Sequence, residues 1–327
     1  MNSISIVIPV YNVAEHLVRC VDSVLAQDCV NLEVLLINDG STDNSGELCD
    51  YFSKKDLRVK VFHQLNSGVS AARNKGMKEA SGDWICFVDA DDWIEPDSLS
   101  KLLMWESINR PDLIIGRAYV NHNGTPKVER YPFTKEDIKG RFSGLQLVTE
   151  RQYLRGSVWG VLYSRDFLIK NKIEFPLNLR NGEDSIFFAI CMVFAKTILF
   201  KEVLFYNIYE RIGSASRSWS FERILGMVDN LQYINNYMIN RASELTDDGR
   251  SILNYSKYGV ISNMWNKFSQ VFSFRRYFIL RKRIREVHTG EISIGNIKIN
   301  RAKVRILNFS LDFFAFMILI KNKVFST

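Results

Sequence analysis

Three carboxylates stand almost side by side in the segment Asp89-Ala90-Asp91-Asp92, directly after the apolar run 84–88. Neighbouring negative charges repel one another unless a cation or a set of hydrogen-bond donors compensates them. Open α/β sheets bind ligands at the carboxyl ends of their strands. A hard divalent metal that holds a phosphorylated ligand would therefore explain the cluster. The alternative is an Asp-rich turn in which Asp92 caps a helix.

Two other polar segments also follow apolar runs. They are Pro9-Val10-Tyr11-Asn12 and Asp39-Gly40-Ser41. In a parallel sheet the carboxyl ends of the strands form one rim, so we expect all three segments to meet there. Tyr11 can stack on a base, Asp39 can accept a base N–H, and the acidic pair can take a ribose and a metal. This combination suits a nucleoside diphosphate with Mg²⁺ or Mn²⁺, because both ions favour oxygen ligands and phosphate.

The first hundred residues alternate between strand and helix patterns, which predicts a mostly parallel sheet in an α/β fold. Continuous β-branched and apolar runs indicate buried strands. Apolar residues at helical spacing, with turn residues between the segments, indicate the helices. The predicted strands are 3–10, 32–38, 59–63 and 84–89, and the predicted helices are 14–28, 45–55, 70–80 and 96 to about 109.

The pattern is less regular beyond residue 111. It predicts strands at 112–117, 158–163 and 198–206 and helices at 221–245 and 251–272. The polar, turn-rich stretch 121–145 is expected to be a loop.

Four ordered motifs in the first 92 residues resemble the family-2 glycosyltransferases with the GT-A fold. They are Ser5-Ile6-Val7-Ile8-Pro9-Val10-Tyr11-Asn12, Leu36-Ile37-Asn38-Asp39-Gly40-Ser41-Thr42-Asp43, Asn66-Ser67-Gly68-Val69-Ser70-Ala71-Ala72-Arg73-Asn74 and Phe87-Val88-Asp89-Ala90-Asp91-Asp92. The resemblance implies a Rossmann-like sheet flanked by helices and a nucleotide-sugar donor. It also implies that Pro9, Tyr11, Asp39 and Asn66 hold the nucleotide, that Arg73 faces it, and that Asp89 binds the ribose and Asp91 the metal.

A fifth segment, Asn181-Gly182-Glu183-Asp184-Ser185, resembles the Glu-Asp pair at which these enzymes begin a helix. In inverting members of the family a carboxylate here deprotonates the acceptor hydroxyl, which is a poor nucleophile until a base takes its proton. We expect Asp184 to be this base, with Glu183 as the second candidate. The alternative is an acidic pair that only complements a helix dipole.

A sixth segment, 206–216, also resembles the family and includes Arg211. The resemblance suggests that Arg211 neutralises the departing diphosphate, as arginine clamps do in other enzymes; a solvated loop arginine is the alternative. Trp159 is expected either to line the acceptor pocket or to lie in the core. The four histidines show no metal-ligand spacing, and we interpret them as structural.

Five cysteines are scattered without a CxxC pair, which favours reduced thiols and a cytosolic setting. No signal peptide is visible, and no apolar run reaches the length of a membrane span. Residues 1–100 have a net charge of −8, whereas residues 211–327 have 19 basic and 8 acidic residues, a net charge of +11. A basic region of this kind suggests an anionic partner.

Basic and aromatic residues are interleaved at 275–285, and Phe313, Phe314 and Phe316 follow. This part of the chain is predicted either to contact an anionic membrane surface or to pack as terminal helices on the catalytic domain. Nucleic acid is not expected, because no nucleic-acid motif accompanies the basic residues. The predicted location is cytoplasmic, peripheral to the inner face of the cell membrane.

We therefore predict a catalytic domain over 1–216, with a nucleotide-sugar half (1–110) and an acceptor half (111–216), and a mainly helical region over 217–327. The predicted reaction is metal-dependent, inverting transfer of a sugar from a UDP-sugar to a saccharide or lipid-linked saccharide, in bacterial surface-polysaccharide assembly. One alternative is a sugar nucleotidyltransferase, which would need a glycine-rich basic loop where Pro9-Val10-Tyr11-Asn12 stands. The other is a non-catalytic nucleotide-sugar-binding protein.

Overall fold

The computed structural model describes residues 3–28, 31–104, 110–122, 128–130, 133–179, 181–210 and 219–287, and separate residues between 292 and 317. The chain divides into two compact units. Unit 1 comprises Met1–Ser143, Ser157–Asn178 and Ala195–Ile212. Unit 2 comprises Gly144–Gly156, Leu179–Phe194 and Gly213–Thr327. The chain passes between the units several times.

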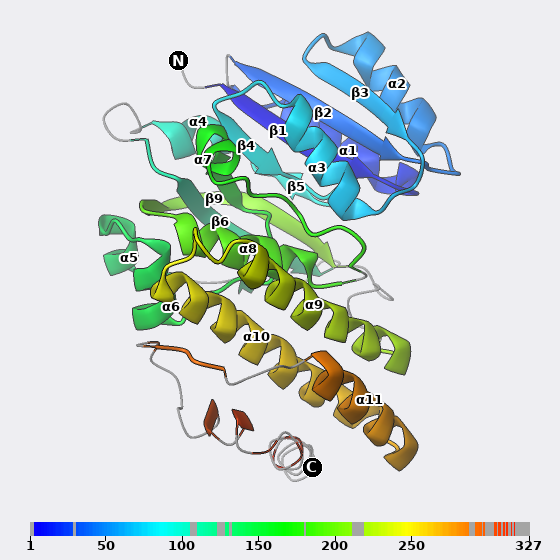
Figure 1. The fold of residues 1–327 in the computed structure, drawn as a ribbon. Helices are drawn as coiled ribbons and strands as arrows, with labels where there is room; N and C mark the ends of the chain where they lie inside the picture. Colours follow the sequence, from blue (N-terminus) through cyan, green and yellow to red (C-terminus); the bar gives the residue numbers. More distant parts are fainter. Residues whose placement is uncertain are drawn as a thin grey trace. The chain divides into compact units, whose positions relative to one another are not determined.

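Unit 1 is built on a sheet whose first half is parallel, as the sequence predicts (Figure 1). Strand β1 (Ile4–Val10) lies between β2 (Leu32–Asp39) and β4 (Trp84–Phe87), and β3 (Val59–Gln64) pairs with β2. All of these pairs are parallel, so their carboxyl ends lie at one edge. The predicted fourth strand was two residues too long, because the backbone leaves the ladder before Asp89.

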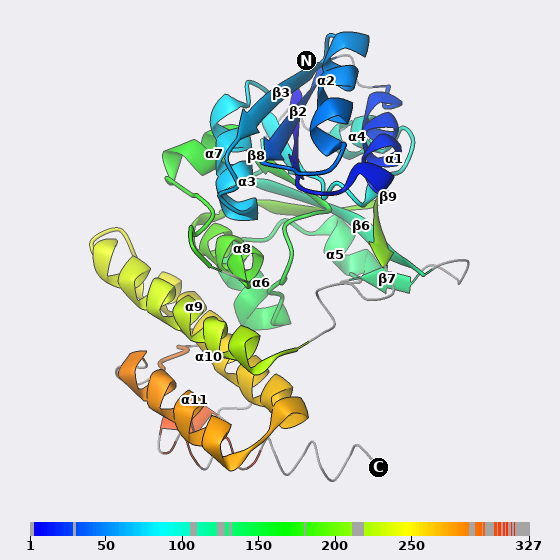
Figure 2. The same cartoon turned by 90° about the vertical axis from the view of Figure 1, so that its right-hand side faces the viewer.

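Helices pack on both faces of this sheet: α1 (Ala14–Leu25) and α2 (Ser45–Lys55) on one, and α3 (Val69–Glu79) on the other (Figure 2). Alternate residues of β1 explain the two layers. Ile4, Ile6 and Ile8 belong to the core cluster that includes α1 and α2 residues. Val7 points the other way, where α3 packs so closely that a Cβ on Gly76 would lie 2.2 Å from the Val7 side chain.

The second half of the sheet is mixed. Strand β8 (Val161–Ser164) runs antiparallel between β4 and β6 (Leu113–His122), β9 (Ile198–Glu210) is parallel to β6, and β5 (Trp93–Ile94) ends the order. Two helices complete this part: α4 (Ser98–Leu103) and α7 (Arg165–Lys170). The helix predicted from Pro96 begins at Ser98, and residues 105–109 lie outside the described residues.

The expected loop at 121–145 was wrong in part. Strand β6 continues to His122, β7 (Val128–Arg130) pairs with it, and α5 (Lys135–Lys139) and α6 (Gly144–Arg151) follow. The short helix α5 forms in a polar stretch because Thr134 and Asp137 make a capping box. Strand pairing and helix capping therefore give this segment regular secondary structure, which hydrophobic periodicity alone did not predict.

Unit 2 is helical. It contains α6, α8 (Glu183–Phe194), α9 (Phe221–Asn240), α10 (Asp247–Phe268), a 3₁₀ turn (Ser269–Val271) and α11 (Phe274–Val287). Helix α10 packs against both α8 and α9, and α11 packs against α9 (Figure 2). Ser220 caps α9 at its predicted start, and α9 ends at Asn240, earlier than predicted. Thr246 caps α10, which therefore begins earlier than predicted.

Helix α11 packs through Leu280 and Ile284, and Arg281 and Arg285 form ion pairs with Asp312. Two of the basic residues at 275–285 are thus paired with an acidic residue of the same unit. Phe313, Phe314 and Phe316 lie outside the described residues. Over the part of the chain that is described, no helix is both long enough and apolar enough to cross a bilayer.

Candidate nucleotide-sugar site

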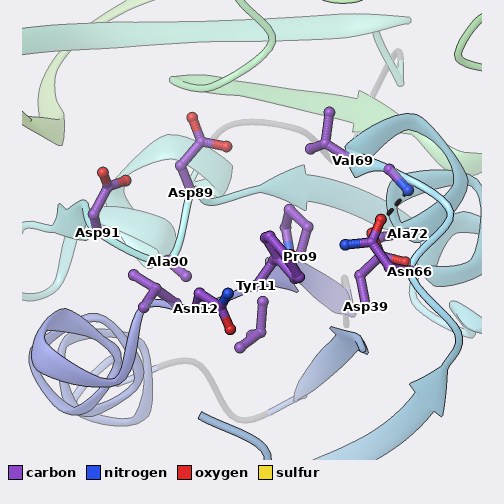
Figure 3. Close-up of a pocket in the computed structure, with 13 residues that line it drawn as sticks. Pro9, Tyr11, Asn12, Asp39, Asn66, Val69, Ala72, Asp89, Ala90 and Asp91 are labelled. Carbon is purple, nitrogen blue, oxygen red and sulfur yellow. Dashed lines mark hydrogen bonds between the residues drawn. The ribbon is translucent and has the colours of Figure 1, made fainter. Parts of the chain in front are cut away.

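A pocket of about 390 Å³ opens at the carboxyl edge of the parallel strands in unit 1 (Figure 3). It brings together the ends of β1, β2 and β4 with the start of α3, as the motif positions predict. Its lining residues are Pro9, Val10, Tyr11, Asn12, Val13, Asp39, Asn66, Gly68, Val69, Ala72, Asp89, Ala90 and Asp91. Six of the predicted site residues are in this set.

Asp39 is held rigidly at the end of β2. Its Oδ1 accepts hydrogen bonds from Gln64 Nε2 (2.7 Å) and Ser67 N (2.8 Å), and its Oδ2 accepts one from Gly68 N (2.8 Å). The carboxylate therefore shapes the loop that leads into α3. Oδ2 accepts this bond with one lone pair, and its second lone pair can accept a base N–H.

Tyr11 forms the open side of the pocket, with 51% of its surface exposed. The next residue, Asn12, adopts a positive φ of 49°, which asparagine tolerates better than most residues. Its Oδ1 accepts a hydrogen bond from Thr42 N (2.8 Å), and its own N–H donates to Ser41 Oγ (3.2 Å). These bonds tie the loop after β1 to the loop after β2, and so fix Tyr11 beside Asp39.

The loop after β2 also contains Gly40, whose φ is +71°. A Cβ at this position would lie 2.7 Å from the backbone nitrogen of Asn66. Only glycine fits this close approach. The motif Asp39-Gly40-Ser41 thus has a geometric reason for each of its residues.

Arg73 lies behind the pocket and is 97% buried, with its Nη2 2.8 Å from Asp89 Oδ1. Its guanidinium also lies over the ring of Phe175, 5.2 Å from the ring centre. Arg73 is not among the lining residues of the pocket, but its partner Asp89 is. A buried guanidinium offsets part of the repulsion among the three neighbouring aspartates.

The turn 89–92 divides its carboxylates between the pocket and the core. Asp89 and Asp91 point to the same side of the pocket (Figure 3). Asp92 is 97% buried and accepts hydrogen bonds from Tyr206 Oη and Tyr209 N, both at 2.7 Å. It therefore does not cap a helix. Burial, together with the charges of Asp89 and Asp91, raises the pKa of Asp92 well above its usual range.

Arg19 holds the same turn from the opposite side. Its Nη2 donates to the Asp91 carbonyl oxygen at 2.6 Å, and its guanidinium lies over the rings of Trp93 and Tyr209. Together with the hydrogen bonds from β9, this contact sets the direction in which Asp91 points.

The donor set suits a hard cation that takes most of its ligands from a diphosphate. Among the described residues no group of three or more His, Cys, Asp or Glu side chains is arranged to hold a metal. Mg²⁺ usually binds proteins through one or two carboxylates and completes its shell with phosphate oxygens and water. Asp91 at the pocket edge, with Asp89 beside it, matches that pattern.

Glu183 and Asp184 form the first turn of α8 in unit 2, as expected of a pair that begins a helix. Trp159 lies in unit 1, stacked on Tyr206 at 5.3 Å between ring centres. Arg211 lies outside the described residues.

The model of the family "Glycosyl transferase family 2" matches residues 5–171, about half of the chain. This chain is a member of glycosyl transferase family 2. The family resemblance expected from the sequence motifs is confirmed.

Curated relatives are similar to this family-2 chain over part of their length. Glycosyltransferase GlyA of Streptococcus pneumoniae is 31% identical over 236 residues, which is 70% of this chain and 33% of GlyA. The putative glycosyltransferase EpsH of Bacillus subtilis is 32% identical over 215 residues, covering 63% of this chain and 60% of EpsH. The chain thus spans between a third and three-fifths of these relatives.

Solved structures confirm the predicted GT-A fold. S. aureus TarS residues 1–349 in complex with UDP-GlcNAc superimposes with a TM-score of 0.68 at 20% identity, covering 98% of this chain and 89% of that one. The mannosyltransferase PcManGT from Pyrobaculum calidifontis, in complex with GDP-Man and Mn²⁺, gives a TM-score of 0.54 at 12% identity.

Sequence reasoning missed the residues that support the site in this family-2 chain. Tyr206 and Tyr209 orient the turn 89–92 from β9, more than a hundred residues along the chain. Gln64 and Arg19 act in the same way on Asp39 and Asp91. Tyr206 and Tyr209 stand in the sixth segment, 206–216, but their spacing does not link them to the turn 89–92, because these contacts depend on which strands pair.

Proposed function

We propose that this protein is a metal-dependent, inverting glycosyltransferase that moves a sugar from a UDP-sugar to a hydroxyl of a saccharide or lipid-linked saccharide. The observation that carries the proposal is the pocket in unit 1. It combines an exposed aromatic ring, a carboxylate fixed beside it, and two carboxylates on one side of the pocket. The ring and the fixed carboxylate suit a base, and the two carboxylates suit a ribose and a metal-bound diphosphate.

The nucleotide is proposed to bind with its base between Tyr11 and Asp39 and its ribose at Asp89. Pro9 and Asn66 line the same pocket and complete the contacts to the nucleotide. The choice of uridine is supported by the fold neighbour TarS, whose structures are in complex with UDP-GlcNAc and with UDP. The neighbour in complex with GDP-Man shows that this fold also accommodates guanine nucleotides, so the base must be tested directly.

The metal is proposed to be Mn²⁺ or Mg²⁺, with Asp91 as its protein ligand. Mn²⁺ accompanies GDP-Man in the fold neighbour PcManGT. When bound, such an ion stabilises the negative charge that develops on the leaving diphosphate. Arg73 holds Asp89 in place through its ion pair, and Arg211 is proposed to add a positive charge near the departing phosphates.

Asp184 is proposed to be the general base, with Glu183 as the alternative. Inversion by a single displacement requires one carboxylate to accept the proton of the attacking hydroxyl. The pair begins α8, where the helix dipole favours the ionised carboxylate that a base needs.

The enzyme is also proposed to act at an anionic membrane surface on the cytoplasmic side. Helix α11 exposes Phe274, Phe278 and Ile279, with 75%, 60% and 40% of their surfaces accessible. Arg275 and Lys282 are exposed on the same helix, and neither forms an ion pair with a described residue. Apolar and cationic side chains on one exposed helix are typical of interfacial binding.

The proposal is tested by measuring UDP release from a panel of UDP-sugars, with and without Mn²⁺, in the presence of candidate acceptors. We expect release that depends on metal and is stimulated by an acceptor. Release of pyrophosphate from UTP and a sugar phosphate would indicate a nucleotidyltransferase. Tight UDP-sugar binding without any turnover would indicate a non-catalytic binding protein.

A further inference from the structure

A second cleft, of about 510 Å³, lies entirely within unit 2. It is lined by the segment after α6, the start of α8, and facing parts of α9 and α10. The charged residues among its described lining are Arg155 and Arg223, and no carboxylate is in that set. A cation is therefore a poor candidate for its ligand.

The lining is dominated by amides, hydroxyls and aromatic rings. Tyr255 and Tyr258 present nearly parallel rings, 11° apart in orientation, and Asn263 is exposed on the next turn of α10. Amide side chains both donate and accept hydrogen bonds, which matches sugar hydroxyls. Aromatic rings provide flat apolar surface, which matches the C–H face of a sugar ring.

Two buried amide atoms in this lining have no hydrogen-bond partner among the residues that the structure describes. They are Asn181 Nδ2 and Asn230 Oδ1, and Asn230 is 99% buried. An unpaired buried polar atom is costly, so such atoms usually have a role. The arrangement around them is tight, because a Cβ on Gly182, where φ is +88°, would lie 2.2 Å from Asn230 Nδ2. Asn181 thus stands two residues before α8, and Asn230 of α9 lies against the backbone of Gly182.

Gly259 gives an independent indication. It lies in the interior of α10 and lines the cleft, yet a Cβ built on it meets no atom within 4 Å. Glycine in a helix interior is destabilising relative to alanine. No described residue lies close enough to this position to exclude a larger side chain. A ligand that lies against the helix backbone would explain the open space.

The cleft also borders the proposed base. Gly182 and Ser185, the residues on either side of Glu183 and Asp184, both line it. A sugar in the cleft would thus lie next to the carboxylate pair, and the cleft and the pair belong to the same unit.

We propose that this cleft binds the acceptor as an oligosaccharide, with a sugar ring against Tyr255 and Tyr258, hydroxyls at Asn181, Asn230 and Asn263, and the chain passing over Gly259. The assignment of this saccharide as the acceptor rests on the proposed function. The saccharide site itself does not rest on the proposed function, because it is argued from the residues that line the cleft.

The test is direct binding to the full chain, without donor, measured by saturation-transfer NMR with a library of free bacterial oligosaccharides at millimolar concentration. Gly259→Leu places a side chain in the cleft while favouring the helix, and is expected to weaken binding at least tenfold. Gly259→Ala adds only a Cβ at the proposed contact and is expected to weaken binding less than Gly259→Leu does. Asn236→Leu is the matched control, since Asn236 is exposed on α9 outside the cleft.

Binding that is lost in Gly259→Leu and kept in Asn236→Leu supports the site. Failure of the wild-type chain to bind any library member, or equal binding by wild type and Gly259→Leu, overturns it. UDP release by the wild-type chain is measured separately and reports on the proposed function. Cleft-dependent saccharide binding without any UDP release would refute the transferase and leave the saccharide site standing.

Discussion

Tyr206 Oη donates a hydrogen bond to Asp92 Oδ2 at 2.7 Å and accepts one from the backbone N–H of Asp89 at 3.0 Å. One phenol thus holds both ends of the turn that presents Asp89 and Asp91 to the pocket. Because Tyr206 is fully buried, its hydroxyl is shielded from water, and its loss takes one partner from Asp92 Oδ2 and one from the half-buried N–H of Asp89.

Tyr206→Phe keeps the ring that stacks on Trp159 and removes only the hydroxyl. We expect a loss of about 1–3 kcal/mol in the free energy of unfolding, and weaker UDP-sugar binding because the turn is less constrained. Urea denaturation and calorimetric titration measure the two effects. Tyr163→Phe is the control, since it removes another buried hydroxyl bond, to Val158 O at 3.0 Å, away from the turn. Equal donor affinity in both variants would contradict the positioning role of Tyr206.

Asp91→Ala should abolish metal-stimulated transfer and leave the fold intact, because removing one carboxylate from a repulsive cluster does not destabilise it. UDP release is measured across a Mn²⁺ titration, with circular dichroism to confirm folding. Asp22→Ala, which removes an exposed carboxylate from α1, serves as the control. Full activity in Asp91→Ala would remove the metal assignment.

Asp184→Asn preserves the shape and hydrogen bonding of the side chain but cannot accept a proton. We expect turnover to fall by roughly 10²-fold or more, with the Kd for the donor nearly unchanged. Glu183→Gln is the paired variant. An inactive Glu183→Gln with an active Asp184→Asn would move the base by one residue, and activity in both would place it elsewhere.

Glu33 gives the chain a defined acid sensitivity. Although burial opposes ionisation, hydrogen bonds from Lys60, Ser5 and Ser81 lower its pKa to about 2 from 4.5. A lowered pKa stabilises the fold above pH 4.5, and this stabilisation is lost as the pH falls toward 2. Glu33→Gln should cost about 2–3 kcal/mol at pH 7 and less at pH 3. Urea denaturation at both pH values checks this, and an equal cost at the two would contradict it.

Membrane binding is tested with liposomes of anionic and zwitterionic lipid. We expect salt-sensitive sedimentation with anionic liposomes, weakened in Phe274→Ser/Phe278→Ser and by deletion of residues 310–327. Each cationic residue near such a surface contributes about 1 kcal/mol. Ile239→Ser is the matched control, because Ile239 is 71% exposed on α9. If the unaltered chain does not bind anionic liposomes at low salt, the exposed side chains of α11 have no role in membrane binding.

The α/β class and the positions of the pocket residues could be predicted from sequence because both depend on the order of strands and helices along the chain. Apolar runs with a period typical of strands or helices define the elements, and Tyr11, Asp39 and Asp89 stand at their ends. Parallel pairing then brings those ends to one edge whatever the details of packing. Predicted boundaries were wrong by a few residues where capping or ladder hydrogen bonds decide them.

Only the tertiary structure gives the physical reason why Asp91 faces the pocket and Asp92 does not. Asp89, Asp91 and Asp92 are nearly equivalent as letters, and only the approach of β9 turns Asp92 toward Tyr206 and leaves Asp91 at the pocket. Likewise, the cleft of unit 2 joins segments about a hundred residues apart, from Gln152 to Asn266. Its residues carry no motif, because their common chemistry arises from helix packing and not from spacing along the chain.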